Sequence, residues 1–262
     1  MKVISFNANG VRAAARNGFY DWLKEQDADF VCIQETKAQE SQLNGIAELF
    51  YPANYFCRYF DAKKKGYSGV AIYAKTKPQN IVTGMGFESC DTEGRYIQFD
   101  YPKLSVISLY LPSGTSGEIR QAVKYDFLEQ FAAHLKRLKA EGRELILCGD
   151  YNIAHKKIDL KNWRGNQKNS GFLPDERAWM DKLFGEMGFI DAFRVINQEE
   201  GQYTWWSYRN RGAWDNNVGW RIDYQVITPG LVELVKKVSV SREVRWSDHA
   251  PLIIEYEGDC CA

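Results

Sequence analysis

Residues 118–152, EIRQAVKYDFLEQFAAHLKRLKAEGRELILCGDYN, carry the clearest evidence for the fold class. Apolar side chains recur at steps of three and four residues from Ile119 onward, which predicts a helix over residues 118–141 with one apolar stripe. Gly142 is suited to end this helix. The following run, residues 144–148, is almost entirely apolar, as in a strand covered on both faces. The stretch therefore predicts an α/β fold with helices packed outside a β core.

Similar patterns elsewhere predict further strands and helices. Two long polar and aromatic stretches, residues 154–175 and 201–219, interrupt them, and loops of this length are usually functional. No linker rich in Pro, Gly or Ser divides the chain, so we expect one domain over residues 1–262. The further expected helices cover residues 19–26 and 176–187, and the further strands cover residues 2–6, 30–34, 55–60, 69–74, 95–100, 104–109, 221–227 and 251–256.

Composition excludes several classes of protein. The hydrophobic fraction of 45% is too high for a disordered chain. No stretch approaches the ~20 apolar residues of a membrane span, so we expect no membrane contact. Lys plus Arg and Asp plus Glu both number 34, giving a net charge of zero. That balance argues against a nucleic-acid packaging protein but allows a local basic groove.

The six cysteines are scattered, and none lies in a CxxC pair. Cys32 and Cys148 fall inside apolar runs and are expected in the core. The N-terminal residues lack a targeting pattern. We therefore predict a reducing compartment and a cytoplasmic location, while no role is predicted for Cys260 and Cys261.

Polar residues next to the strands carry the functional signal. One such residue alone would be a turn former or a helix cap. Six clusters in one domain instead indicate a shared site where strand ends meet. The clusters contribute Asn7, Glu35, Tyr110, Asp150 with Asn152, Asp223, and Asp248 with His249.

This set is rich in oxygen ligands and contains one His and no Cys, which favours Mg²⁺, or Mn²⁺ in its place, over zinc. Several carboxylates held together without a cation would raise one another's pKa, and a divalent metal relieves that conflict. The combination indicates phosphoester chemistry, in which metal, His and amide donors neutralise charge on a phosphate.

Seven segments, in this order, resemble the exonuclease III family of apurinic/apyrimidinic (AP) endonucleases, within the endonuclease/exonuclease/phosphatase superfamily. The resemblance spans nearly the whole chain. It implies a four-layer α/β sandwich, with two central mixed β-sheets flanked by helices. The segments are FNANGVR (6–12), IQETK (33–37), YLPSG (110–114), GDYNIAH (149–155), GNQKNSGF (165–172), GWRIDY (219–224) and SDHAPL (247–252).

The resemblance also implies catalytic roles. Asp150 would position or deprotonate the attacking water, with Asn152 sharing that task. His249 would contact the scissile phosphate and Asp223 would hold its orientation, while Tyr110 would donate to the phosphate or steady the leaving oxygen. Glu35 would be the principal metal ligand, and the remaining metal-site residues would be Asn7, Asp248, Asp150 and Asn152.

Two positions depart from the family pattern. Asn9 stands where some relatives carry Asp, and this removes one possible ligand charge. Ser113 stands where relatives often carry Asn or Gln, and its shorter side chain alters a phosphate contact. Neither departure changes the catalytic and metal-site residues named above, so we expect an active enzyme.

The long loops decide the expected substrate. Trp205, Trp220 and Ile222 would line a pocket for an extruded baseless deoxyribose, which is small and largely apolar and costs little to flip out. Trp206 is expected in the core. Basic and amide side chains in the loops would contact the DNA backbone: Arg164, Asn166, Lys168, Asn169, Arg209 and Arg211.

The resemblance thus predicts a DNA repair enzyme that cleaves the phosphodiester 5′ to an abasic site in duplex DNA. Products would be a 3′-hydroxyl and a 5′-deoxyribose phosphate, and 3′–5′ exonuclease and 3′-phosphodiesterase activities on blocked ends would accompany it. The protein is expected to act as a monomer. Three alternatives stay open: a mainly 3′–5′ exonuclease of this family, another phosphoesterase of the superfamily, and an inactive nucleic-acid-binding regulator.

Overall fold

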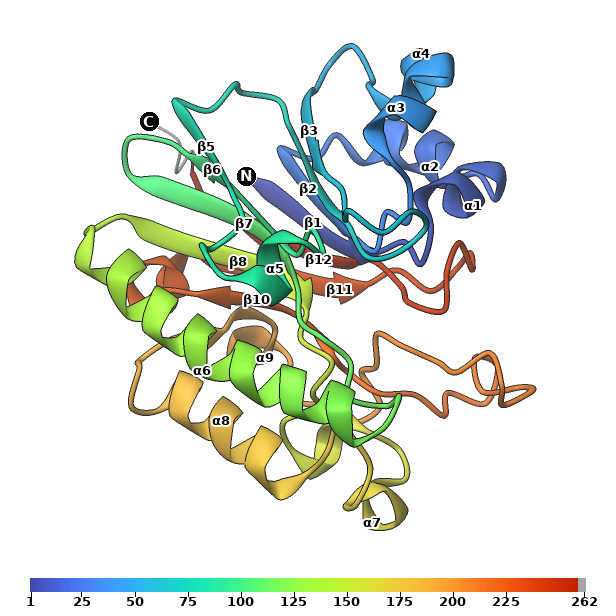
Figure 1. Cartoon of the computed structure of the whole chain (residues 1–262), viewed down its shortest axis with the longest axis vertical. Coiled ribbons are helices and arrows are strands. Elements are labelled where there is room, and N and C mark those ends of the chain that lie inside the picture. The colour runs from blue at the N-terminus through green and yellow to red at the C-terminus, as the bar shows by residue number, and fades with distance from the viewer. Residues whose placement is uncertain (259–262) are drawn as a thin grey trace.

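The computed structural model describes residues 1–258, which fold into two six-stranded sheets packed face to face (Figure 1). In spatial order, the first sheet comprises β11 (Val235–Val240), β12 (Leu252–Tyr256), β1 (Lys2–Asn7), β2 (Phe30–Gln34), β4 (Val70–Ala74) and β3 (Phe56–Phe60). The second comprises β5 (Asn80–Thr83), β6 (Tyr96–Asp100), β7 (Leu104–Tyr110), β8 (Glu144–Asp150), β10 (Asp223–Ile227) and β9 (Ile190–Asp191).

Helices cover the outer face of each sheet. On the first sheet lie α1 (Val11–Arg16), α2 (Phe19–Gln26), α3 (Glu40–Leu43) and α4 (Ala47–Phe50), and on the second lie α6 (Glu118–Ala140) and α8 (Pro174–Phe184). Short elements complete the described chain: α5 (Glu88–Asp91), α7 (Trp163–Asn166), α9 (Ala192–Ile196), and the 3₁₀ turns Asn44–Ile46, Lys157–Asp159 and Pro229–Leu234.

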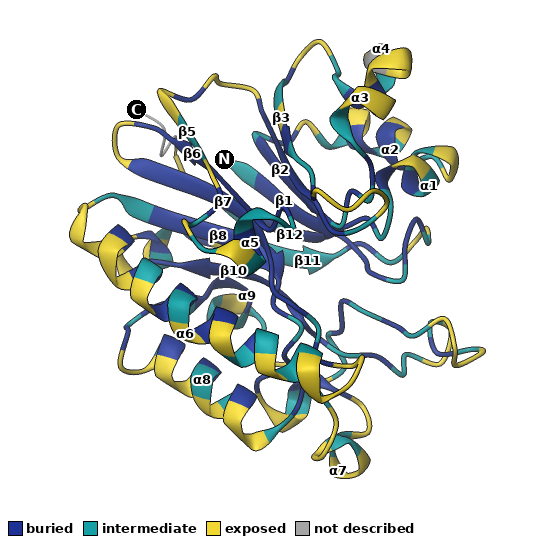
Figure 2. Ribbon diagram, in the orientation of Figure 1, coloured by how far each residue is buried: buried dark blue, intermediate teal, exposed yellow. Residues whose placement is uncertain are grey.

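Three apolar layers hold these elements together. One lies between the sheets, where Cys32 and Cys148 are both buried. Another packs α1 and α2 on the first sheet, and a third packs α6 and α8 on the second. Buried residues therefore follow the strands and only the inner stripes of the helices (Figure 2). The expected four-layer sandwich is confirmed, because strands covered on both faces become the near-continuous apolar runs seen in the sequence.

All nine expected strands are present, with ends within two residues of the prediction. Three strands were not predicted: β5 and β11 are partly exposed and polar, and β9 has only two residues. The helix expected over residues 176–187 runs instead from Pro174 to Phe184. Ile119 was wrongly placed on the inward stripe of α6: it is 83% exposed, in the helix's first turn.

The expected burial of Cys32 and Cys148 is confirmed. Cys260 and Cys261 lie outside the described residues. Among residues 1–258, no helix has the length and apolar character needed to cross a membrane.

Each sheet has a parallel pair at its centre, and these pairs position the site. β1 runs parallel to β2, and β7 runs parallel to β8. Their carboxyl ends place Asn7, Glu35, Tyr110 and Asp150 at the same end of the sandwich. The strand that follows β8 in the sheet, β10, is antiparallel and starts with Asp223 directly opposite Asp150. The two sheets thus bring six separate chain segments to one edge, because β12 likewise starts just after the Asp248–His249 pair.

Candidate active site

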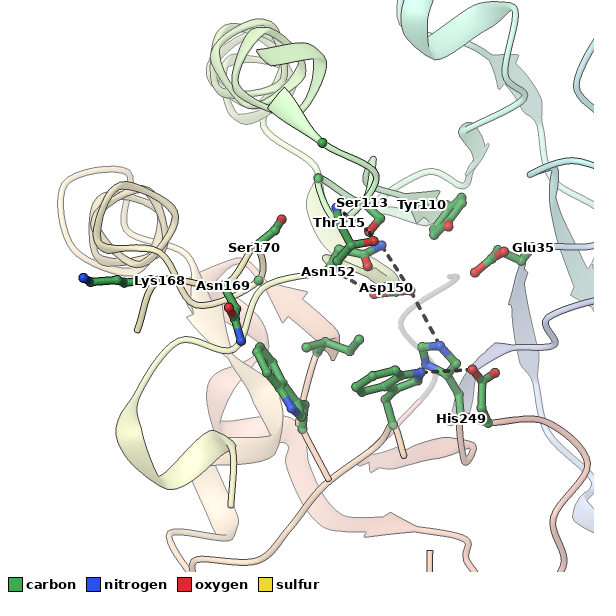
Figure 3. Close-up of a pocket in the computed structure, with 17 residues that line it drawn as sticks. Glu35, Tyr110, Ser113, Thr115, Asp150, Asn152, Lys168, Asn169, Ser170 and His249 are labelled. Carbon is green, nitrogen blue, oxygen red and sulfur yellow. Dashed lines mark hydrogen bonds and ion pairs between the residues drawn. The ribbon is translucent and has the colours of Figure 1, made fainter. Parts of the chain in front are cut away.

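A cavity of about 590 Å³ opens at this edge, between the strand ends and the long loops (Figure 3). One side is formed by predicted catalytic and metal-site residues: Glu35, Tyr110, Asp150, Asn152, Asp248 and His249. The other side is formed by the loops, with Lys168, Asn169, Ser170, Gly171, Trp205, Trp220 and Ile222. Ser113, Gly114, Thr115 and Gly117 close the rim before α6.

Glu35 enters the cavity from a sharply turned backbone. Its φ of 49° is a left-handed conformation that is costly for a residue with a side chain. Hydrogen bonds hold it there: the Gly10 amide donates to the Glu35 carbonyl (2.8 Å), and the Thr36 amide donates to the Gly69 carbonyl (3.1 Å). Gly69 is required at this point, since an added Cβ would lie 2.3 Å from Oγ1 of Thr36. The turn therefore aims the Glu35 carboxylate into the site.

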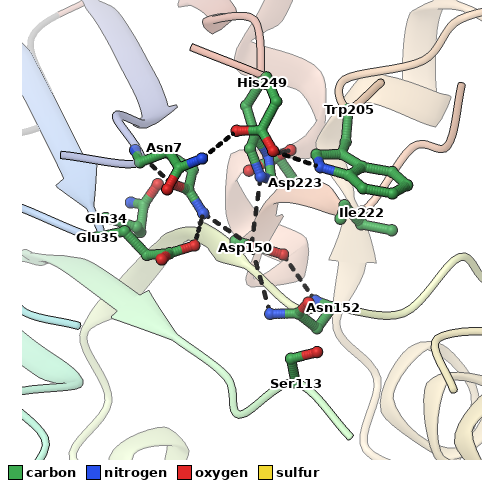
Figure 4. Close-up of polar contacts among 12 residues, drawn as sticks. Asn7, Gln34, Glu35, Ser113, Asp150, Asn152, Trp205, Ile222, Asp223 and His249 are labelled. Atoms are coloured by element: carbon green, nitrogen blue, oxygen red, sulfur yellow. Dashed lines mark hydrogen bonds and ion pairs between the residues drawn. The ribbon is translucent and has the colours of Figure 1, made fainter. Parts of the chain in front are cut away.

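Asn7 bridges the two principal carboxylates (Figure 4). Its amide nitrogen donates to Oε1 of Glu35 and to Oδ2 of Asp150, each at 2.9 Å. Its amide oxygen accepts from the backbone N–H of Asn9 at 2.9 Å. Asn7 therefore crosses from the first sheet to the second and fixes the spacing of the acids.

Asp150 and Asn152 form a tight local turn at the end of β8. The Asn152 amide donates to Oδ1 of Asp150 at 2.8 Å, and its side chain donates to the Leu111 carbonyl at 3.0 Å. Asn152 has a φ of 51°, which Asn tolerates better than most residues. Burial and then the charge of Asp223 raise the pKa of Asp150 to about 8, so this carboxyl can accept a proton near neutral pH.

His249 is held by a carboxylate behind it. Its Nδ1 lies 2.8 Å from Oδ2 of Asp223, and its Nε2 lies 3.9 Å from Oδ2 of Asp150. Burial lowers the pKa of His249, but the charge of Asp223 outweighs burial and the pKa is raised to about 10. The imidazole is therefore cationic at neutral pH, facing the cavity with its free nitrogen.

The Asp223 end of this pair is fixed by a residue that we did not predict. Oγ1 of Thr204 accepts hydrogen bonds from the backbone amides of Ile222 and Asp223, each at 3.1 Å. Thr204 directly precedes Trp205, so one short segment supplies both the support for Asp223 and part of the pocket wall.

The donor set fits a hard divalent cation. The carboxylates of Glu35 and Asp150 and one nitrogen of His249 lie within 4.8 Å of one another, and because protonated His249 has no lone pair to offer, the carboxylate oxygens are the ligands for a cation. The raised pKa of Asp150 shows that these acids are poorly compensated, which a cation would relieve. Asp248 is not part of this group, and its two oxygens accept hydrogen bonds from Asn9 at 2.8 Å and from Trp205 Nε1 at 3.0 Å.

Tyr110 lies against a buried cation that the sequence reading missed. The Arg95 guanidinium is 4.6 Å from the centre of the Tyr110 ring and donates to the Tyr110 carbonyl at 2.8 Å. Burial and then the charge of Glu35 hold the pKa of Tyr110 well above its usual value. The phenol therefore stays protonated and can donate. The only local signal for Arg95 was a charged residue at the start of an apolar run.

The aromatic side of the cavity is built by two tryptophans at right angles. The ring centres of Trp205 and Trp220 are 6.2 Å apart, with planes at 83°. Ile222, which is 6% exposed, lies in the same apolar cluster. Trp206 is fully buried, in the core as expected.

The predicted DNA-contacting residues divide into two groups. Lys168 and Asn169 line the cavity. Asn166 instead organises its loop, since it accepts from Asn169 and donates to the Asn162 carbonyl, each at 2.8 Å. Outside the cavity lining, Arg164 packs on the Trp163 ring, and Arg209 and Arg211 lie exposed on the next loop.

The two departures at Asn9 and Ser113 also have defined contacts. Asn9 donates to Asp248 and accepts from Lys37, whose Nζ lies 2.8 Å from Oε2 of Glu35. Ser113 shares a hydrogen bond of 2.9 Å with Thr115 at the cavity rim. Asn9 therefore ties Asp248 to the Glu35 turn as a neutral linker.

Comparison with known proteins agrees with this geometry. The model of the Endonuclease/Exonuclease/phosphatase family matches residues 4–249. The chain is 41% identical to the exodeoxyribonuclease of Bacillus subtilis (strain 168), covering 96% of this chain and 98% of that protein. It is 39% identical to DNA repair nuclease APEX1 of Danio rerio, covering 97% of this chain and 81% of that protein.

A solved structure of an AP endonuclease from Archaeoglobus fulgidus superimposes with a TM-score of 0.89 at 29% identity, covering 98% of this chain and all of that one. The sequence resemblance, the layered fold and the match over nearly the whole chain therefore agree. The chain belongs to the Endonuclease/Exonuclease/phosphatase family.

Proposed function

We propose that this DNA repair nuclease hydrolyses the phosphodiester 5′ to an abasic site in duplex DNA, leaving a 3′-hydroxyl and a 5′-deoxyribose phosphate. One observation carries the proposal: the acidic and amide residues beside His249 share one cavity with Trp205 and Trp220. Relatives named exodeoxyribonuclease and DNA repair nuclease support it. An inactive regulator is disfavoured, because Glu35, Asp150, Asp223 and His249 all converge.

Glu35 would hold Mg²⁺, or Mn²⁺ in its place, with Asn7 fixing its spacing from Asp150, which stays free to take a proton. When bound, such a cation neutralises charge that develops on the phosphate. Residues of the chain itself bind and orient the phosphate. Cationic His249, held by Asp223, binds a non-bridging oxygen of the scissile phosphate. Tyr110 donates a hydrogen bond to the same phosphate group.

Asp150 accepts the proton of the attacking water. Its carboxyl is buried, is positioned by the Asn7 and Asn152 amides, and has a pKa raised to about 8. A carboxyl whose pKa lies near the working pH is partly deprotonated and still binds a proton strongly enough to take one from water.

The aromatic side selects the substrate. A sugar without a base fits between Trp205, Trp220 and Ile222, whereas a complete nucleotide is larger and costs more to unstack. Lys168 and Asn169 at the rim contact the DNA backbone. Terminal 3′ blocking groups present the same phosphate to the same cluster, so 3′–5′ exonuclease and 3′-phosphodiesterase activities accompany incision.

The protein acts as one catalytic domain and as a monomer, and the catalytic cluster and the aromatic wall lie in one cavity of that domain. It works in the cytoplasm, beside the nucleoid. The four cysteines of the described chain are free thiols, which suits a reducing compartment.

The test is incision of a duplex with one tetrahydrofuran abasic analogue, beside the same duplex with an intact nucleotide, in Mg²⁺ and in EDTA. We expect strong preference for the analogue, with a 3′-hydroxyl product, and no incision in EDTA. Equal cutting of both duplexes would overturn the abasic pocket. Activity that persists in EDTA would overturn the metal requirement. Resection of 3′ ends on the same duplex measures the exonuclease share.

A further inference from the structure

A fully buried ion pair lies behind the cavity wall. Lys124 of α6 and Glu176 of α8 are both 0% exposed, and Nζ of Lys124 lies 2.5 Å from Oε1 of Glu176. Burial lowers the pKa of Lys124 and the charge of Glu176 only partly restores it. A buried pair of this kind is weak evidence for added stability, because apolar residues of similar size often serve as well. A positional role is therefore worth seeking in its other contacts.

Lys124 connects the pair to the catalytic side of the cavity. Its ammonium donates to the backbone carbonyl of Asn152 at 2.8 Å. Asn152 lies in the turn that holds Asp150, and its own side chain and amide also contact Asp150. The hydrogen bond from Lys124 thus links the position of the Asn152 turn to the position of α6.

Glu176 connects the pair to the opposite wall. Its Oε2 accepts from the backbone amides of Gly171 (2.6 Å) and Leu173 (3.0 Å), and its Oε1 accepts from the Ser170 hydroxyl (3.3 Å). Ser170 and Gly171 line the cavity. The Glu176 carboxylate therefore holds residues 170–173, near the end of the long loop over residues 154–175, in place.

Gly171 is the point where the two walls meet. Its carbonyl accepts from the Ala154 amide at 2.8 Å. An added Cβ would lie 3.1 Å from the Trp220 ring and 3.2 Å from the Asn152 carbonyl, and φ is +95°. No space remains between Trp220, Gly171 and Asn152, so a shift of the Gly171 backbone moves one wall relative to the other.

We propose that Lys124 and Glu176 form a positioning pair that sets the gap between the Asn152 turn and the Trp220 wall, and thereby the discrimination between a baseless sugar and an intact nucleotide. This inference rests on the proposed function. The pair touches no reacting atom. It fixes two walls from behind, and displacements near 1 Å at such supports are enough to change turnover by about 10²-fold.

The experiment compares a double variant of the Lys124–Glu176 pair with a control variant in α6. Lys124→Met with Glu176→Leu removes both charges together, so that no buried charge is left unpaired. Leu138→Ala is the matched control: it destabilises the far end of the same helix, where Leu138 is 4% exposed and packs in the core away from the cavity. For each, kcat/KM is measured on the abasic-analogue duplex and on the intact duplex, together with Tm.

We expect the double variant to lose at least about tenfold of the abasic preference, which is the size of effect that a poorly fitting pocket produces. Leu138→Ala should lower Tm and leave the preference unchanged, since a merely structural loss affects both substrates alike. A folded double variant with the wild-type preference would overturn the inference.

If the double variant does not fold, Glu176→Gln decides in the same assay, because it keeps the side-chain shape and one acceptor for the Gly171 amide. Reduced preference supports the pair, and an unchanged preference overturns it. The abasic preference of the wild-type protein distinguishes a failure of the proposed function from a failure of the positioning pair. Without any abasic preference in the wild type, the proposed function itself fails. With preference in the wild type and in every variant, only the positioning pair fails.

Discussion

The two sides of the cavity are organised in opposite ways. The strand-end cluster (Asn7, Glu35, Asp150, Asp223 and His249) is mostly buried, and its members hydrogen-bond one another directly. The loop wall (residues 163–171 and 205–222) presents exposed Lys168 and Asn169 beside partly buried tryptophans. The first side is preorganised by its own contacts, whereas the second is held from behind.

The catalytic residues and the loop wall are therefore held in position by different parts of the fold. In the cluster, Asn7, Glu35 and Asp150 stand at the ends of parallel strands, and Asp223 starts the antiparallel strand β10. The loop wall relies on buried ion pairs: Lys124–Glu176 at one end and Asp159–Arg221 at the other. Chemistry and recognition can therefore be disrupted separately.

The largest effect is expected from Asp150→Asn in the cluster. An amide cannot accept the proton of water, so kcat/KM on the abasic duplex should fall by more than ~10³-fold. Tm should not fall, because the raised pKa of Asp150 shows that its charge opposes folding. Single-turnover kinetics measure the fall in activity, and thermal unfolding measures Tm. A clear loss of Tm, or residual activity within about tenfold of wild type, would show that the cluster does not work as described.

Asp223→Asn should cost about 10³-fold, by analogy with other His–carboxylate pairs. The raised pKa keeps His249 cationic until the pH rises through about 10. Without Asp223 that charge is lost as pH rises through the ordinary range near 6.5. The defect should therefore be larger at pH 8.5 than at pH 6, which the pH profile of kcat/KM measures. An equal defect at both pH values would argue that Asp223 does not act through the histidine charge.

The two sides also differ in how far the sequence predicts them. Apolar runs predicted nine strands, and the polar residues beside them, among them Asn7, Glu35 and Asp150, were expected to share one site because six such clusters occur in one domain. The register that sets Asp223 opposite Asp150 joins segments 73 positions apart, and local patterns do not contain it.

The buried charges behind the loop wall escaped prediction for a related reason. Lys124 in a helix reads as solvent-exposed, and its partner Glu176 lies 52 residues away. Arg221 and Asp159 are 62 residues apart. Only the packed structure reveals that such charges are internal. The family resemblance supplied the aromatic pocket, which spacing alone does not indicate.

Asp159→Asn tests the second anchor of the loop wall. Burial raises the pKa of Asp159, but Arg221 and Arg194 outweigh it and lower the pKa to about 2. The carboxylate therefore stabilises the fold above its unfolded-state pKa near 4, and that contribution is lost as pH falls through 2. We expect the variant to lose about 3 kcal/mol of unfolding free energy at pH 7. Its stability should also depend less on pH between 4 and 2.

Urea denaturation at pH 7 and in steps down to pH 2 measures this change. Asp181→Asn is the matched control, since the Asp181 side chain is 57% exposed and pairs with exposed Lys156 and with His155, whereas Asp159 is buried. Its stability at pH 7 should stay within about 1 kcal/mol of wild type. If the free energy of unfolding falls equally with pH in the wild type and in Asp159→Asn, Asp159 does not anchor the loop wall.

The smallest effect is expected at the exposed rim. Lys168 lines the cavity and Arg209 does not, although both are exposed cations. If Lys168 contacts a phosphate, Lys168→Ala should raise KM a few-fold and reduce the slope of log(kcat/KM) against log[salt] by about 1. Arg209→Ala should change both less. kcat should be unaffected in either variant, because the cluster does not depend on rim charges for its geometry. A fall in kcat for Lys168→Ala at saturating DNA would mean that the loop wall takes part in organising the chemistry, and the separation between the two sides would then not hold.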